Sequence, residues 1–214
     1  MSGQGSSGKN VHSRFVYFDL GKVMVNFDHQ IAVQNLGKLA GRDAETIDDA
    51  VFGSGLQDRY ETGLVDSATY AATVNQSLGT SLSTDEITEA VSAIFTLNEP
   101  ILTALEMLDR AGIPMGVLSN TCEAHWEWIV RRGWKIPGNW FREIVLSYEV
   151  QSMKPNSKIY EVCEQKAACE PGHIFFTDDR QENIEAAQAR GWNTYLFRSA
   201  DELCKHLATW LQTP

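Results

Sequence analysis

The amino-acid sequence predicts an α/β protein, with an open parallel sheet and a small helical domain inserted after the first strand. Three observations predict this fold class. Short apolar runs recur along the 214 residues, helical patterns lie between the later runs, and residues 30–98 carry helix signals without a convincing buried strand. Strands that alternate with helices favour a parallel sheet that is covered by helices on both faces.

Five apolar runs are predicted to be strands of this sheet. Each is too short for a helix and rich in β-branched or aromatic residues, and none shows the clean alternation of polar and apolar residues that marks a half-exposed strand. Strands that are buried on both faces of a parallel sheet have this composition. The runs are residues 15–18, 115–118, 143–146, 173–176 and 194–197.

Two segments between the later strands are predicted to be helices. Residues 100–111 present apolar side chains on one face, with Pro100 near the start and Gly112 just past the end. Residues 183–190 form a second helical stretch that ends before Gly191. Both helices are expected to pack on the sheet.

The middle of the chain is predicted to be a helical insert. The stretch from Ser83 to Glu86 is a capping box, and Asp66 or Ser67 is expected to cap a helix over residues 68–78. We therefore expect an α/β core from residues 14–30 and 99–214, with a helical cap domain over 31–98. The Gly- and Ser-rich residues 1–13 are expected to be a disordered lead.

The charge of the chain disfavours several classes of partner. Eighteen Lys and Arg against 28 Asp and Glu give a net charge of −10, which repels nucleic-acid phosphates and anionic membrane surfaces. Four cysteines without a CxxC pair indicate a reducing compartment, and no apolar run approaches the ~20 residues of a membrane span. We expect a cytoplasmic monomer or homodimer that binds neither nucleic acid nor membranes.

Polar side chains follow four of the predicted strands at the points where the strands end. Ligands of open parallel sheets bind at this edge, so we expect these side chains to lie close together. They are Asp19 after the first strand, Ser119 and Asn120 after the second, Lys154 beyond the third, and Asp178 and Asp179 after the fourth.

Each of these residues also has a structural explanation. Asp19 alone is typical of a turn, Ser119 and Asn120 could cap a helix that begins near Glu123, and Lys154 could be a solvated loop residue. The adjacent pair Asp178–Asp179 is harder to explain in this way, because carboxylates that gather beside Asp19 repel one another unless a cation lies among them. The joint pattern therefore indicates a site that uses a cation.

This constellation resembles the haloacid dehalogenase-like (HAD) hydrolase superfamily, subfamily I, whose core is Rossmann-like and whose helical cap follows the first strand. The stretches that carry the resemblance are FVYFDLGKV (15–23), MGVLSNT (115–121), MKPNSKIY (153–160) and HIFFTDDRQENIEAAQARG (173–191). The DLGKV and SNT…H arrangement is closest to the branch that contains bacterial α-glucose-1-phosphate phosphatases.

The resemblance implies a Mg²⁺-dependent phosphatase that acts on a small phosphorylated metabolite, such as a sugar phosphate, through an aspartyl-phosphate. It implies that Asp19 is the nucleophile, that Lys154 neutralises phosphate charge, and that Ser119 hydrogen-bonds the phosphoryl oxygens. It further implies substrate binding by Ser119, Asn120, His125 and Lys154, and metal ligation by Asp19, the Gly21 carbonyl, and Asp178 or Asp179.

The sequence departs from the phosphatase pattern at Gly21, where active members usually carry a second Asp. That Asp protonates the leaving group, and such acid–base catalysis is typically worth roughly 10²- to 10⁴-fold in rate. Three interpretations stay open: a substrate whose leaving group needs little proton help, a slow or inactive site, or a substitute group. The candidate substitutes are Lys22, Asp28, His29 and His125.

Two alternatives compete with the phosphatase prediction. Metal-independent haloacid dehalogenases of the same superfamily also lack the second Asp, but they have no need of the paired carboxylates Asp178 and Asp179. A catalytically weak binding protein that keeps the fold is the other alternative, supported by the tryptophans at 126, 128, 134 and 140. Substrate choice is expected to lie in the cap, where residues 59–61 could contact the leaving group.

Overall fold

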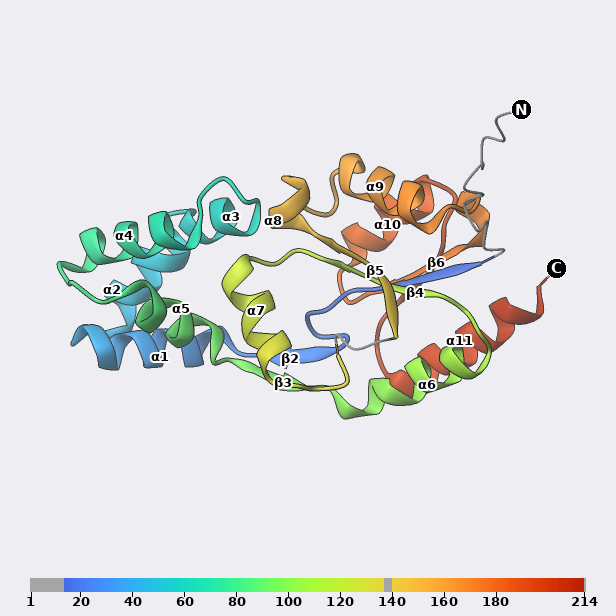
Figure 1. Cartoon of the computed structure of the whole chain (residues 1–214), viewed down its shortest axis with the longest axis horizontal. Helices are drawn as coiled ribbons and strands as arrows, with labels where there is room; N and C mark the ends of the chain where they lie inside the picture. Colours follow the sequence, from blue (N-terminus) through green and yellow to red (C-terminus); the bar gives the residue numbers. More distant parts are fainter. Residues whose placement is uncertain (1–13, 137–139, 214) are drawn as a thin grey trace, which may run out of the picture.

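The computed structural model describes residues 14–136 and 140–213 of the chain. Within these residues the core is a five-stranded parallel sheet in the order β5–β4–β1–β6–β7 (Figure 1). The strands are β1 Phe15–Phe18, β4 Met115–Ser119, β5 Phe141–Leu146, β6 Ile174–Asp178 and β7 Asn193–Leu196. Each overlaps one of the five predicted strands, so the predicted Rossmann-like open parallel sheet is confirmed.

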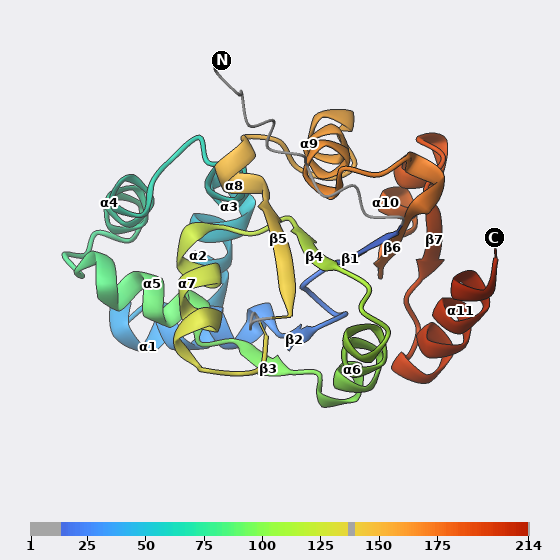
Figure 2. The ribbon, with the colours of Figure 1, turned by 45° about the vertical axis from the view of Figure 1, so that its right-hand side comes forward.

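Helices cover both faces of the sheet, as the composition of the strands predicts. In β1, Val16 and Phe18 pack into one hydrophobic core, whereas Phe15 and Tyr17 pack into another on the opposite face. Figure 2 shows α6 and α11 together on one side of the sheet and α9 on the other. The covering helices are α6 Leu102–Arg110, α9 Ser157–Ala167, α10 Gln181–Ala189 and α11 Ala200–Gln212.

A group of helices, α1 to α5, lies between β1 and β4 in the chain and is called the helical insert below. It has its own buried apolar core, so it packs around itself rather than on the sheet. A short antiparallel pair, β2 Val25–Phe27 and β3 Phe95–Leu97, joins it to the core, and the sequence did not predict these strands. Its helices are α1 His29–Ala40, α2 Ala44–Asp48, α3 Leu56–Glu61, α4 Ser67–Leu78 and α5 Thr84–Ser92, with a π-helical segment at Asp49–Gly53.

Local signals set the ends of several helices. Asp66 caps α4 by accepting a hydrogen bond from the Thr69 backbone N–H, and the capping box of Ser83 and Glu86 begins α5, as predicted. The helix after β4, α7 Glu123–Arg131, begins after Cys122 and has no side-chain cap. Ser119 and Asn120 therefore do not cap this helix, so helix capping does not explain why these two residues are present.

The helical insert contacts the core where α5 packs on α7, with the Trp128 indole N–H donating to Glu89 at 3.0 Å, and at one end of α3 (Figure 1). The Ala124 backbone N–H, at the start of α7, donates to the Tyr60 hydroxyl at 3.2 Å. The Ser147 hydroxyl donates to the Glu61 carbonyl at 2.6 Å and accepts from the Thr121 N–H at 2.9 Å. A single hydroxyl thus ties the insert to the loop that follows β4.

Within the described ranges 14–136 and 140–213, no helix combines the length and apolar character that a membrane span requires. The lead predicted over residues 1–13 lies outside the described residues.

The contact between the helical insert and the core is tested by comparing two glycines. Gly55 and Gly63 both adopt positive φ, 69° and 71°, so alanine strains the backbone by about 1–2 kcal/mol at either position. An added Cβ finds open space at Gly55 but overlaps the carbonyl oxygen of Tyr148 at Gly63. We expect Gly63→Ala to lower the free energy of unfolding by about 1–3 kcal/mol more than Gly55→Ala does, measured by urea denaturation. Equal losses would show that the contact carries no stability.

Candidate active site

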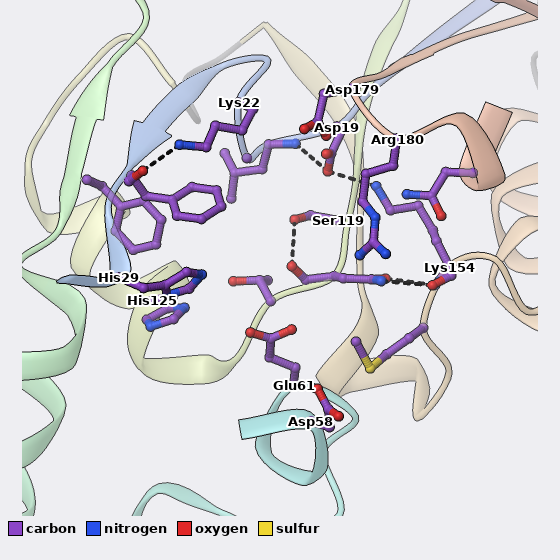
Figure 3. A pocket seen from close by; sticks show the side chains of 18 residues that line it. Asp19, Lys22, His29, Asp58, Glu61, Ser119, His125, Lys154, Asp179 and Arg180 are labelled. Atoms are coloured by element: carbon purple, nitrogen blue, oxygen red, sulfur yellow. Dashed lines mark hydrogen bonds and ion pairs between the residues drawn. The ribbon is translucent and has the colours of Figure 1, made fainter. Parts of the chain in front are cut away.

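The carboxyl ends of the sheet strands meet in a cavity of about 250 Å³ between the core and the helical insert. Asp19 directly follows β1, Ser119 ends β4, and Asp179 directly follows β6, while Lys154 comes from the loop before α9. All four line the cavity, and Figure 3 shows them around its inner wall. The residues predicted from the strand ends are therefore brought together.

Lys154 is the central cation of this wall. Its ammonium donates to Asp19 Oδ1 at 2.8 Å, to Asp178 Oδ2 at 2.6 Å and to the Leu118 carbonyl at 2.9 Å, so all three of its protons are used. The side chain is only 1% exposed. Burial by itself lowers the pKa of Lys154, but the charges of Asp178 and Asp19 outweigh burial, and its pKa is raised.

Asp19 is held with one oxygen bound and the other free. Oδ1 accepts from the Leu20 N–H at 2.7 Å as well as from Lys154, whereas Oδ2 accepts no hydrogen bond within the described residues. Burial raises the pKa of Asp19 to about 7, with Lys154 acting in the opposite direction and the charge of Asp178 adding to the rise. The free oxygen is the one available to a ligand or a reacting centre.

The two adjacent carboxylates after β6 have different surroundings. Asp178 is fully buried, and besides Lys154 it accepts from the Arg180 N–H at 2.8 Å and from the Asn183 amide at 3.0 Å. The Asp179 side chain faces the cavity and has no such donors in the described structure. Its pKa is raised by burial first and then by the charge of Asp178.

Asn183 belongs to the site, although the sequence analysis did not select it. It is buried in the first turn of α10, lines the cavity, and its Oδ1 has no hydrogen-bond partner. The available signal was its position, five residues after Asp178, on the helix that follows the carboxylate pair. A buried oxygen without a donor is costly, so it points to a group outside the chain.

The residues present fit a hard divalent cation. Oxygen atoms of Asp19, Asp178 and Asp179 all lie within 4.8 Å of one another, and the unpartnered oxygen of Asn183 is nearby on the same wall. Three carboxylates share one ammonium, which leaves uncompensated negative charge. Mg²⁺ prefers such oxygen ligands and usually takes only one or two of them directly, with water in the other positions.

Asn120 acts on the backbone of Lys154. Its amide donates to the Lys154 carbonyl at 2.9 Å, and its Oδ1 accepts from the Lys154 N–H at 2.7 Å. The predicted substrate-binding residue Asn120 is thus occupied in positioning the lysine. The Ser119 hydroxyl, in contrast, makes only a long hydrogen bond of 3.3 Å to the Asn120 carbonyl and faces the cavity.

The position of the missing acid at Gly21 is filled by an aromatic ring. A Cβ at Gly21 would lie 2.9 Å from Cε1 of Phe27. Lys22 follows with a φ of 59°, a conformation that costs a side-chain-bearing residue of order 1–3 kcal/mol. Its ammonium lies 4.3 Å from the Phe27 ring centroid and donates to the Phe27 carbonyl. A second carboxylate therefore has no room here unless Phe27 moves.

The other predicted substitutes for that acid have varied positions. Asp28 caps α1 through the Gln30 N–H at 2.9 Å and does not line the cavity. His29 and His125 do line it, from α1 and α7. Burial lowers the pKa of His125 to about 4, with His29 contributing, so its ring is neutral near pH 7 and is unsuited to donate a proton as a cation.

The helical insert contributes part of the cavity wall through one end of α3. Of the predicted residues 59–61, only Glu61 lines the cavity, since Arg59 is exposed and the Tyr60 hydroxyl is bound at α7. Asp58, which the sequence analysis did not select, also lines it. Burial raises the pKa of Glu61 to about 7, opposed by a hydrogen bond of 2.9 Å from Gln57.

Comparison with known proteins identifies the family. The profile of the haloacid dehalogenase-like hydrolases matches residues 60–197. The chain belongs to this family. The match spans most of the core together with the later part of the helical insert, so the chain is a HAD-like hydrolase, as the motifs predicted.

Three relatives bear on the chemistry. The chain is 26% identical over 186 residues to the D-ribitol-5-phosphate phosphatase of Bacteroides thetaiotaomicron, covering 84% of this chain and 89% of that protein. It is also similar to the crystal structure of a HAD family enzyme from the same organism, in complex with magnesium and inorganic phosphate. That comparison gives a TM-score of 0.77 and 26% identity, covering 88% and 96% of the two chains. A (S)-2-haloacid dehalogenase of Pseudomonas fluorescens is 29% identical over 90 residues, covering 42% of this chain and 38% of that protein.

The role of Lys154 in holding the site together can be tested by its removal. We expect Lys154→Met to lower the free energy of unfolding by about 3–5 kcal/mol, because it leaves Asp19 and Asp178 buried without a cation. The matched control is Lys166→Met, since Lys166 forms an exposed pair with Glu143 at 3.6 Å that is worth about 1 kcal/mol or less. Adding Asp178→Asn to Lys154→Met should recover part of the loss. Equal losses for both lysines, measured by chemical denaturation, would contradict this role.

Proposed function

We propose that this HAD-like hydrolase is a Mg²⁺-dependent phosphatase that acts on a small phosphorylated polyhydroxy metabolite, a sugar or sugar-alcohol phosphate. The observation that carries the proposal is the free Oδ2 of Asp19, which stands beside a buried ammonium and two further carboxylates at one end of a cavity. The similarity to a D-ribitol-5-phosphate phosphatase and to a HAD family enzyme crystallised with magnesium and inorganic phosphate supports it.

In this mechanism Asp19 attacks the phosphorus atom with Oδ2, the bond between phosphorus and the ester oxygen breaks, and the leaving group departs as an alcohol. Water then hydrolyses the aspartyl-phosphate to inorganic phosphate and the free carboxylate. The Leu20 N–H and the Lys154 ammonium hold Oδ1, so the attacking oxygen has a fixed direction. Lys154 also favours the ionised form of Asp19, and the Ser119 hydroxyl donates to the phosphoryl oxygens. A bound Mg²⁺ supplies the positive charge that offsets the repulsion between the phosphate and the carboxylate.

The cation-holding residues in this proposal are Asp19, Asp179 and the backbone carbonyl of Gly21. We assign the direct contact after β6 to Asp179 rather than Asp178, because both oxygens of Asp178 already accept hydrogen bonds from Lys154, Arg180 or Asn183. Asp178 then acts as the partner that orients Lys154. Asn183, whose Oδ1 has no hydrogen-bond partner, lies beside these residues and holds Asp178 through its amide.

The ring of Phe27 in place of a second carboxylate favours substrates whose leaving group needs little proton help. Acid–base catalysis at this position is worth roughly 10²- to 10⁴-fold, so unactivated alkyl phosphates should be slow unless a group of the substrate or a water supplies the proton. The leaving group of an anomeric sugar phosphate departs more readily than the leaving group of a simple alkyl phosphate.

The first test is phosphate release from a panel of sugar phosphates, sugar-alcohol phosphates and an activated aryl phosphate. We expect release only with Mg²⁺, and a fall of at least about 10³-fold for Asp19→Asn, because the amide cannot form the acyl phosphate. The control is Asp28→Asn, a carboxylate that caps α1 outside the cavity, whose rate should stay unchanged. Halide release from a 2-haloacid without added metal, with no phosphate release from any compound, would favour the dehalogenase alternative.

The assignment of the cation ligand is tested by a pair of neighbouring variants. We expect Asp179→Asn to raise the Mg²⁺ concentration for half-maximal activity by roughly tenfold or more, because it removes a charged ligand. Asp178→Asn should instead lower the free energy of unfolding, with a smaller change in that Mg²⁺ concentration, because Asp178 pairs with Lys154. The reverse pattern, with the larger Mg²⁺ effect at Asp178, would overturn the assignment.

A further inference from the structure

Two imidazoles form a part of the cavity wall to which the proposed mechanism gives no role. His29 begins α1 of the helical insert and His125 lies in α7 of the core, and Figure 3 shows them next to each other, away from Asp19 and Lys154. The positions of Asp19 and Lys154 fix the phosphate end of the cavity. A leaving group that extends from the phosphate end toward α1 and α7 meets the two rings.

The two rings are held by aromatic neighbours rather than by charges. His125 packs edge-on against Phe95 at 5.1 Å, Phe95 against Phe27 at 5.9 Å, and Phe27 against His29 at 5.0 Å, all between ring centroids. Phe52 contacts the other side of His29 at 5.0 Å. These rings fix the planes of the imidazoles on an apolar support, which is the usual construction of a specific polar contact in a small-molecule site.

His125 has the character of a hydrogen-bond acceptor. It is only 6% exposed, and both burial and the nearby His29 disfavour its charged form, so the ring is neutral. The backbone of Val91 lies beside the ring and favours a proton on the nitrogen that faces it, which is the single N–H of a neutral imidazole. The second ring nitrogen therefore carries a lone pair, and only a donor can satisfy it.

His29 complements it from the helical insert. Burial lowers its pKa, and Lys22 lowers it further, while Asp28 and Asp48 act in the opposite direction. A neutral imidazole offers one donor and one acceptor, so this ring can donate a hydrogen bond to a hydroxyl oxygen or accept one from a hydroxyl proton. Two neutral rings have little attraction for a second phosphate or a carboxylate, whereas both can hydrogen-bond an uncharged hydroxyl group.

We propose that His125 and His29 are specificity-determining residues that read a hydroxyl group of the leaving group, with His125 accepting its proton in a hydrogen bond. This inference rests on the proposed phosphatase function and adds to it the part of the substrate that is recognised. The ligand is thus an uncharged polyhydroxy group attached to phosphate. Because one ring comes from the insert and the other from the core, the hydroxyl group is bound by both parts of the chain at once.

The test compares two substrates that share the phosphate and differ in the leaving group. One is the best sugar or sugar-alcohol phosphate of the panel, and the other is p-nitrophenyl phosphate, which has no hydroxyl group to read. We expect His125→Phe to lower kcat/KM for the polyhydroxy substrate by roughly 10- to 100-fold and for the aryl phosphate by less than about threefold. His125→Asn, which keeps an acceptor and a donor, should recover part of the loss.

Two further variants separate recognition from folding. His29→Phe changes an accessible ring at the cavity and should lower the same substrate ratio, so the test does not depend on how well the buried position 125 tolerates phenylalanine. His173→Asn is the matched control, because His173 is exposed in the segment before β6 and does not line the cavity. Its kinetic constants should equal those of the wild type.

Equal losses on both substrates for His125→Phe and His29→Phe would overturn the inference, because they would show a role in packing. An unchanged ratio in both variants would overturn it as well, and so would wild-type enzyme that hydrolyses the aryl phosphate but no polyhydroxy phosphate. In the first two cases the proposed function survives whole, and in the third its Mg²⁺-dependent phosphatase activity survives while its polyhydroxy substrate class is overturned as well. Its own failure is recognised separately, by the absence of Mg²⁺-dependent release from every compound including the aryl phosphate.

Discussion

The site depends on one buried ammonium that binds two buried carboxylates. Lys154 reaches Asp19 after β1 and Asp178 at the end of β6, and the side chain of Asn120 after β4 holds its backbone. Three strands of the sheet are thereby coupled through one side chain. Burying three charges is unfavourable unless each is paired and hydrogen-bonded, and every proton of the ammonium has an acceptor here. The same arrangement that keeps these charges inside the protein also directs the free oxygen of Asp19 into the cavity.

The neighbourhood of Gly21 distinguishes this chain from the phosphatase pattern that its other motifs follow. The Phe27 ring occupies the space beside Gly21, and the next residue, Lys22, keeps a strained backbone while its ammonium covers that ring. Gly21 is thus part of a packed arrangement of three residues, and a single substitution would not simply restore a carboxylate. In the proposed phosphatase, no side chain at position 21 can protonate the leaving group. The missing acid therefore favours substrates whose leaving group departs without such a proton.

The helical insert contributes to the cavity through contacts that also join it to the core. Ser147 hydrogen-bonds the Glu61 carbonyl, and Glu61 and Asp58 line the cavity from the same short helix α3. The two imidazoles come from the start of α1 in the insert and from α7 in the core. Any movement of the insert therefore changes the distance between His29 and His125, as well as access to Asp19.

The sequence by itself determined the positions of the five sheet strands along the chain, the parallel sheet with a helical insert after the first strand, and the residues that gather at the edge of the sheet. Burial on both faces gives a strand a uniformly apolar pattern, and the ends of parallel strands must converge, so Asp19, Ser119 and Asp179 could be found from local patterns. The tertiary structure decided the rest. The pairing of β2 with β3, the use of Asn120 to hold Lys154, the partners of Asp178 and the unpartnered Asn183 oxygen arise from contacts between distant segments. The neutrality of His125 likewise follows from burial, which is a property of the packed fold and leaves no local mark in the sequence.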